Sequence, residues 1–188
     1  MVRVILLSAE RGAGKTTACL RLVGLAREAG LTAGGIVAPA RYDAAGTKVG
    51  IDVVDVAGGE RRALACVARD ARRATVGQYR FDPAIEAWAL RVLLGAIDRP
   101  LDVAIIDEIG PLEMLQGKGY ATVLDRLPRS SCRSAVVLVR PSLTEALADR
   151  LAALSPTTVT LTLANRDGVP ATLLREIGGT RMNADFPD

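Results

Sequence analysis

Residues 4–17 read VILLSAERGAGKTT, which is an apolar run, a glycine-rich turn and the start of a segment with helical spacing. Strand, glycine-rich turn and helix in this order are the setting of a phosphate-binding loop. The glycines let successive backbone N–H groups turn inward, and the positive end of the helix dipole adds to the attraction for phosphate. The stretch therefore predicts a loop that binds a triphosphate.

Two side chains of this loop carry specific expectations. Lys15 is expected to reach the β- and γ-phosphates, and the Thr16 hydroxyl to bind Mg²⁺. The strict motif has glycine at position 9, where alanine is tolerable if its φ stays negative. The plain alternative is a glycine-rich turn with an incidental Lys-Thr pair. The expected contacts to phosphate come from Ala9, Glu10, Arg11, Gly12, Ala13, Gly14, Lys15, Thr16 and Thr17.

Length and composition bound the class of protein. The 188 residues suffice for one sizeable core, so residues 1–178 are expected to form a single domain and 179–188 a loose tail. A net charge of +3 without a basic block, and only 3% aromatic residues, argue against nucleic-acid binding. Three isolated cysteines and no histidine exclude structural zinc and suit a reducing cytoplasm. Apolar runs are too short for a membrane span.

Apolar periodicity predicts an α/β fold, since strands alternate with helices along the chain. Such alternation implies a mainly parallel sheet with helices on both faces, into which 49–56 and 61–67 insert an antiparallel hairpin. Residues 41–47 are expected to be turn-rich, and Cys19, Cys66 and Trp88 to be core residues. The other predicted strands are 2–8, 31–38, 101–106, 135–139 and 157–163, and the predicted helices are 15–29, 83–97, 120–127, 143–154 and 171–177.

A second motif, VAIIDE at residues 103–108, is an apolar strand that ends in two carboxylates. Ligand sites of parallel sheets lie at the carboxyl ends of strands, so this end should face the phosphate-binding loop. Asp107 is expected to hold Mg²⁺ and Glu108 to orient or deprotonate an attacking water. The alternative is an acidic strand end that is merely solvated. Glu113 is either a supporting group of this site or a surface acid on a turn.

Together these motifs resemble the THEP-type, or cancer-related, nucleoside-triphosphatases, which are small P-loop proteins with a nucleotide-kinase-like fold. The matching segments are Gly14–Thr17, Gly50–Asp55, Val76–Tyr79, Asp107–Glu113 and Asn165–Asp167. The resemblance covers nearly the whole chain, and DEIGP-x-E is its most specific part. It implies a three-layer P-loop NTPase fold and Mg²⁺-dependent hydrolysis of ATP, GTP and other nucleoside triphosphates to diphosphate and phosphate, with loose base preference.

The resemblance also gives expected roles for several further residues. Arg41 stands near an arginine of the family pattern, and Arg140 replaces a histidine at a strand end, from which it is expected either to sense the γ-phosphate or to lie on the surface. Gly110, within the Asp107–Glu113 motif, is expected near the nucleotide. Asn165 and Arg166 follow the last strand, where a base is commonly held, with helix capping by Asn165 or Asp167 as the alternative.

Two other functions stay open at this point. A nucleotide or small-molecule kinase needs an arginine-rich lid, for which Arg69, Arg72 and Arg73, or Arg126, Arg129 and Arg133, are the candidates. A nucleotide-dependent switch or assembly factor would bind nucleotide with little turnover of its own. No protein partner is indicated by the sequence.

Overall fold

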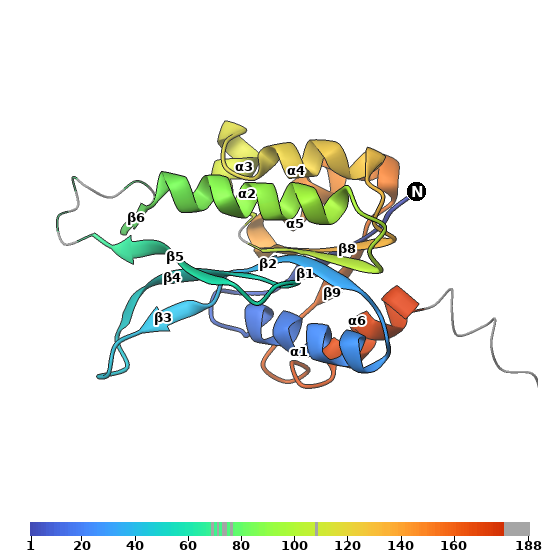
Figure 1. Ribbon diagram of the computed structural model, residues 1–188, viewed down its shortest axis with the longest axis horizontal. Coiled ribbons are helices and arrows are strands. Elements are labelled where there is room, and N and C mark those ends of the chain that lie inside the picture. Colours follow the sequence, from blue (N-terminus) through green and yellow to red (C-terminus); the bar gives the residue numbers. More distant parts are fainter. Residues whose placement is uncertain (69, 71, 73–74, 76, 108, 179–188) are drawn as a thin grey trace, which may run out of the picture.

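A computed structural model describes residues 1–68, 70, 72, 75, 77–107 and 109–178. A nine-stranded mixed sheet lies between two layers of helices (Figure 1), in the order β6-β5-β4-β2-β7-β8-β1-β9, with β3 paired to β4 beside this path. This confirms the predicted α/β fold with a mainly parallel sheet and an antiparallel hairpin. The tail at 179–188 lies outside the described residues.

The parallel part of the sheet contains the strands that carry both sequence motifs. It runs from β2 (Ala33–Val37) through β7 (Val103–Ile106), β8 (Ser134–Val139) and β1 (Arg3–Ser8) to β9 (Thr157–Thr160). The side chains of β1, β7 and β8 are largely apolar and buried on both faces, as expected of strands covered by helices on either side, whereas β9 at the edge carries mostly exposed threonines. Strand β8 separates β1 from β7, so the two motif-bearing strands are not neighbours.

The antiparallel part continues the sheet from β2 and is called the extension below. It consists of β4 (Lys48–Asp55), β5 (Arg61–Val67), β6 (Tyr79–Phe81) and β3 (Ala40–Tyr42). The hairpin of β4 and β5 was predicted, whereas β3 and β6 were not, because three-residue strands carry too little periodicity to be recognised.

The expectation of a turn over 41–47 was therefore wrong at its beginning. Residues 40–42 pair with β4, and the turn is confined to the segment after them. There the Asp43 carboxylate accepts hydrogen bonds from the N–H groups of Ala45 and Thr47, which closes the hairpin tip.

The two helical layers bury separate apolar clusters. Helices α1 (Lys15–Glu28) and α6 (Val169–Gly178) cover one face, and α2 (Pro83–Ile97), α3 (Pro111–Gln116), α4 (Ala121–Arg126) and α5 (Pro141–Arg150) cover the other (Figure 1). Helix α2 has the predicted bounds because Asp82 caps its first N–H groups and proline stands at its first turn. Short 3₁₀ turns follow α4 at Leu127–Arg129 and α5 at Ala152–Leu154.

Three individual residues were predicted to lie in the core. Cys19 and Trp88 are buried, as predicted. Cys66, on β5 of the extension, is only half-buried and does not join the core. Helix α3 was not predicted, because its six residues carry little periodicity; proline stands at its first position, to which it is well suited.

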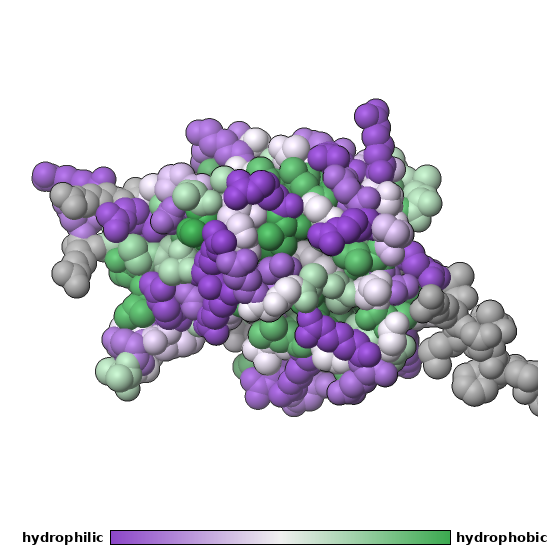
Figure 2. Space-filling view, in the orientation of Figure 1, coloured by the Kyte–Doolittle hydropathy of each residue, from purple (hydrophilic) through white to green (hydrophobic). Residues whose placement is uncertain are grey.

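The surface seen in Figure 2 is largely hydrophilic, with apolar side chains distributed among polar ones. The large exposed apolar side chains of the described residues come from separate elements, namely Leu20, Tyr42, Leu115 and Leu163 beside the terminal Met1. No helix within the described part of the chain has the length and apolar character that crossing a bilayer requires.

Candidate active site

The glycine-rich loop between β1 and α1 has the backbone geometry that phosphate binding requires. Gly12 and Gly14 have φ values of 81° and 105°, a region that other residues adopt only with strain. Gly14 also precedes the first turn of α1 without any side-chain cap, so the N–H groups of that turn point toward the space above the loop.

The backbone conformation and burial of Ala9, the first residue of the loop, explain why alanine can replace glycine there. Ala9 does not have a positive φ and is 1% exposed. Its N–H donates to the carbonyl oxygen of Val139 at the end of β8, at 3.3 Å. Alanine at this position therefore continues the strand and adds a methyl group to the core, as the sequence allowed.

Lys15 lies over its own loop. Its ammonium donates to the backbone carbonyl oxygen of Ala9 and, at 3.1 Å, to that of Glu10. These contacts hold the positive charge above the glycines, next to the N-terminus of α1, where a phosphate would be attracted by both.

Thr16 and Asp107 meet although 91 residues separate them. The Thr16 hydroxyl donates to Asp107 Oδ2 over 3.1 Å, and the same oxygen accepts the N–H of Ala38 over 2.9 Å. Asp107 is 5% exposed, so its carboxylate is fixed by its surroundings. Ala38 follows β2, and its contribution was not apparent from the sequence because it is made by the backbone.

The same pair fits a magnesium ion. Hydroxyl and carboxylate oxygens are the hard ligands that Mg²⁺ prefers, and Mg²⁺ commonly takes one or two protein ligands and completes its shell with phosphate and water. Within the described residues no cluster of three or more His, Cys, Asp or Glu side chains is arranged for a metal. The donors present therefore suit an ion that arrives with a nucleotide.

A buried thiol lies beside this pair without being part of it. Burial, together with the negative charge of Asp107, raises the pKa of Cys19 well above its ordinary value of 9.0. The thiol stays protonated at neutral pH and is a core residue rather than a nucleophile.

Beyond Asp107 the chain enters a loop that Glu113 organises. Glu108, the candidate base, lies outside the described residues. The Glu113 carboxylate accepts the N–H of Gly110 at 2.9 Å and that of Tyr120 at 3.3 Å, and Arg150 donates to the Glu113 carbonyl oxygen. Glu113 is 4% exposed, which excludes the surface acid on a turn and favours a supporting group.

The pKa of Glu113 reflects this position. Burial raises it above the ordinary 4.5, against the opposing effect of the backbone hydrogen bonds from Gly110 and Tyr120. Gly119 is needed nearby, because an added β-carbon there would collide with Glu113 Oε1.

The ends of β8 and β9 complete the same edge of the sheet. Arg140 is exposed after β8, and its carbonyl oxygen accepts the hydroxyl of Thr144, which is also hydrogen-bonded to Ser8 at the end of β1. After β9, the Asn165 side chain bonds the backbone of Thr160 and Thr162 within its own loop. The first turn of α5, directly after Arg140, and the end of β1 are thus joined by side chains that the sequence did not single out.

Asp167 and Arg166 follow Asn165 in an exposed loop. Asp167 pairs with Arg21 of α1 at 2.6 Å, and the hydrogen bond from Arg21 lowers the pKa of this carboxyl group below its ordinary 3.8. The loop after β9 is therefore tied to the helix that follows the phosphate-binding loop. Neither the Asn165 nor the Asp167 side chain makes a capping hydrogen bond to α6 among the described contacts, whereas the Asn165 carbonyl oxygen accepts the N–H of Val169 at 3.2 Å.

One of the two proposed arginine lids is placed away from this edge. Arg126 pairs with Asp98 at the end of α2, and Arg133 directly precedes β8 and pairs with Asp102. With Arg129 between them, they lie at the amino ends of the parallel strands, opposite the phosphate-binding loop. In the other set, Arg72 is exposed, and Arg69 and Arg73 lie outside the described residues.

A mainly parallel sheet, a strand that leads through a glycine-rich loop into a helix, and a hydroxyl–carboxylate pair at the same edge define the protein as a member of the P-loop class. Comparison with known proteins narrows this class. The model of the NTPase family matches residues 4–174. The chain therefore belongs to the NTPase family.

Individual relatives agree with this assignment. The nucleoside-triphosphatase THEP1 of Thermofilum pendens is 32% identical over 173 residues, 92% of this chain and 93% of that protein. That of Pyrobaculum aerophilum is 38% identical over 121 residues, which span 63% of this chain and only 65% of the relative. The solution structure of a human cancer-related nucleoside triphosphatase superposes with a TM-score of 0.74 at 24% identity, covering 96% of this chain and 100% of that one, and shows the shared fold.

Proposed function

We propose that the protein is a Mg²⁺-dependent nucleoside-triphosphatase that hydrolyses ATP, GTP and other nucleoside triphosphates to diphosphate and phosphate. The observation that carries the proposal is the contact between Thr16 and Asp107, which brings the two sequence motifs to one point beside the phosphate-binding loop. The family membership and the names of the relatives support the same activity.

The position of each residue determines the role proposed for it. The backbone N–H groups from Arg11 to Thr16 and the Lys15 ammonium bind the phosphates, and Thr16 and Asp107 would hold Mg²⁺. Bound there, the ion neutralises charge that develops on the phosphate oxygens. Glu108 follows Asp107 directly and is the residue proposed to orient or deprotonate the attacking water. Arg140, exposed after β8, is proposed to contact the γ-phosphate.

Base recognition is proposed to be loose. The Asn165 amide already bonds the backbone of its loop, so the contacts to a base are left to Arg166, which can stack on a ring, and to the loop backbone. Backbone groups and stacking distinguish bases less sharply than a paired side-chain amide does. The isolated cysteines suit a protein of the reducing cytoplasm, which is the localisation proposed for it.

Phosphate release from ATP, GTP, CTP and UTP, with Mg²⁺ and with the metal chelated, tests the proposal. We expect turnover of several nucleotides that stops on chelation. Glu108→Gln should bind nucleotide as before and hydrolyse it roughly 10²–10⁴-fold more slowly, as general-base removal predicts. Glu145→Gln, an equal change at an exposed position of α5, is the control and should leave turnover unchanged.

Other outcomes would replace the proposal. Turnover that persists in Glu108→Gln removes that residue from its role. Faster transfer of phosphate to an added nucleoside or monophosphate than to water would indicate a kinase, although three of its candidate lid residues lie at the opposite edge of the sheet. Tight nucleotide binding with negligible turnover would indicate a switch or an assembly factor.

A further inference from the structure

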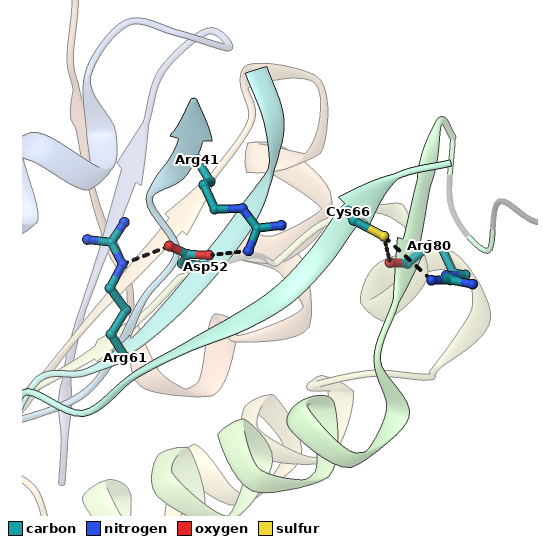
Figure 3. A network of polar contacts seen from close by, with 5 residues as sticks. All are labelled: Arg41, Asp52, Arg61, Cys66 and Arg80. Atoms are coloured by element: carbon teal, nitrogen blue, oxygen red, sulfur yellow. Dashed lines mark hydrogen bonds and ion pairs between the residues drawn. The ribbon is translucent and has the colours of Figure 1, made fainter. Parts of the chain in front are cut away.

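The extension carries a compact group of charged residues that the proposed function does not use. In it, the Asp52 carboxylate pairs with two arginines, with Arg41 Nη1 at 3.3 Å and Arg61 Nε at 2.7 Å. Figure 3 shows the two guanidinium groups approaching the carboxylate from opposite sides. The three residues come from β3, β4 and β5, so only the folded sheet brings them together.

The group is built to hold Arg41 in one place. Gly50, two residues before Asp52 on the same face of β4, lies beneath the Arg41 side chain. A β-carbon at Gly50 would stand 2.8 Å from Arg41 Nη2 and would also meet the carbonyl oxygen of Ala65. Glycine thus leaves the space for the guanidinium, and Asp52 orients it, which reduces the conformational freedom that a long side chain would lose on binding.

The group retains a net positive charge that can act on a ligand. One carboxylate faces two guanidinium groups, so a single unit of positive charge remains. The Asp52 side chain is 9% exposed, whereas those of Arg41 and Arg61 are 35% and 56% exposed. Because a guanidinium carries five N–H groups in a planar fork, one pairing with Asp52 leaves Arg41 further donors of a kind that match a phosphate.

The face of the sheet places the group on the side of the phosphate-binding loop. Val54 packs in the cluster beneath α1, and Asp52 and Gly50 lie two and four positions before it, on the same face of β4. Ile51 and Val53 point to the opposite face, under α2. Helix α1 begins at the phosphate-binding loop, so the charged group continues the face on which that loop lies.

Backbone hydrogen bonds set its distance from the metal ligands. The N–H of Ala38 donates to Asp107, and the carbonyl oxygen of Pro39, the next residue, accepts the N–H of Asp52 at 2.9 Å. Arg41 follows Ala38 by three residues, about 10 Å of extended chain. A side chain as long as that of arginine therefore spans much of the gap back toward Asp107.

Tyr79 of β6 is influenced by charges from both the extension and the phosphate-binding loop. Burial of the Tyr79 hydroxyl raises its pKa, but hydrogen bonds from Gln78 and Lys48 and the positive charges of Lys48 and Arg11 outweigh this and bring it below 10.0. Arg11 belongs to the phosphate-binding loop and Tyr79 to β6. Residues of the loop and of the extension thus act on the same hydroxyl group, although Tyr79 itself packs in the cluster under α2.

We propose that Arg41, held by Gly50 and Asp52, contacts the terminal phosphate of a bound nucleoside triphosphate and stabilises the charge that develops there during transfer. This inference rests on the proposed function for the identity of the ligand. Arg61 compensates the charge of Asp52, so that the carboxylate positions Arg41 without cancelling its attraction for phosphate.

Binding and turnover measured separately test the inference. Affinities for Mg²⁺ with ADP, and for Mg²⁺ with a non-hydrolysable ATP analogue, are determined by calorimetry for the parent and for Arg41→Ala. We expect affinity for the analogue to fall roughly 10–100-fold, as loss of a charge-assisted hydrogen bond predicts, with affinity for ADP unchanged. Where the parent hydrolyses ATP, kcat should fall by roughly 10²–10³-fold.

Two further variants keep the outcome interpretable. Arg129→Ala makes the same change of charge at an exposed site on the opposite edge, and should alter neither affinity. Arg41→Lys keeps the charge without the planar fork, and should recover part of the lost affinity for the analogue even if Arg41→Ala folds poorly.

The inference and the proposed function fail in different ways. Equal losses for ADP and the analogue, or no loss for either, would overturn the role of Arg41 while leaving hydrolysis by the parent intact. Absent hydrolysis by the parent would overturn the proposed function, yet a selective loss of analogue binding in Arg41→Ala would still support the contact with the terminal phosphate.

Discussion

The phosphate-binding loop and the extension both present positive charge at one edge of the sheet, but they are built differently. Every member of the loop lies within residues 9–17, and its geometry follows from glycines and from the start of a helix. The charged group of the extension takes one residue from each of three strands. We therefore expect residues of the loop to affect ligand binding with little effect on stability, and residues of the charged group in the extension to affect both.

The largest expected effect tests the local motif. Lys15→Ala removes the ammonium that faces the phosphates, and we expect nucleotide affinity to fall roughly 10–100-fold or more, because a charged hydrogen bond to phosphate is lost. The free energy of unfolding should change much less, since Lys15 is only partly buried and belongs to a loop outside the apolar core. Calorimetry with Mg²⁺ and ATP, beside denaturant unfolding, measures both.

Lys118→Ala is the matched control for Lys15→Ala, because Lys118 is exposed between α3 and α4. It should change neither quantity. A large loss of stability in Lys15→Ala would erase the distinction between the two regions, because the loop would then also be holding the fold together.

A smaller effect tests the cross-strand group. Asp52→Ala leaves Arg41 and Arg61 facing each other without their shared carboxylate, and we expect a loss of about 1–2 kcal/mol in the free energy of unfolding. The value is modest because both arginines are partly solvated. Affinity for ADP should stay the same, while that for a triphosphate analogue declines as Arg41 loses its orientation.

The control for Asp52→Ala is Asp149→Ala on the exposed side of α5, which we expect to change stability by less than about 0.5 kcal/mol. If the two variants unfold at the same denaturant concentration, the ion pairs of Asp52 contribute nothing measurable and the extension is held by its backbone alone.

The smallest expected effect concerns Glu86 of α2, which belongs neither to the phosphate-binding loop nor to the extension. Burial raises the pKa of Glu86, and the negative charges of Glu113 and Asp82 raise it further. The folded protein then binds more protons than the unfolded chain at pH values just above 4.5, so stability falls as the pH rises through this window. Glu86→Gln should therefore stabilise the protein at pH 7.

Because Glu86 is half-exposed, this gain should be only a few tenths of a kcal/mol after allowance for solvent screening. It should disappear as the pH falls below 4.5, where the carboxyl group is protonated in both states. Unfolding curves of the parent and Glu86→Gln at pH 4 and pH 7 measure the difference, and a gain that is the same at both pH values would contradict the explanation.

The contrast between a local loop and a group built from several strands also explains which parts of the structure the sequence could predict. The loop, Lys15, Thr16 and the strand that ends at Asp107 were accessible, since each is signalled by adjacent residues. The meeting of Asp107 with the Ala38 N–H, and the link from Ser8 to Thr144, were not, because they depend on strand order and register. Helix α3 was missed because a helix of six residues shows little periodicity.

Residues of the extension show the limit most clearly. Gly50 and Asp52 lie in a segment that could be matched to the family, but their alternation gave no sign that both serve Arg41. That role arises from the pairing of Arg41 with Gly50 across two strands. Sequence patterns report which face a residue occupies, whereas the partner across the sheet is decided by the fold.

The position of β8 between β1 and β7 also fixes the distance between the two strands that carry the site. Neighbouring strands lie about 4.8 Å apart, so the ends of β1 and β7 are separated by about 10 Å. Strand β8 keeps this spacing through its parallel pairing with both, up to Val139 beside Ser8 and Val137 beside Ile106. The strand ends that carry the phosphate-binding loop and Asp107 are thus held one strand apart, and Thr16 closes the remaining distance to Asp107. A change in the register of β8 would therefore displace these two residues relative to each other without any change in the site itself.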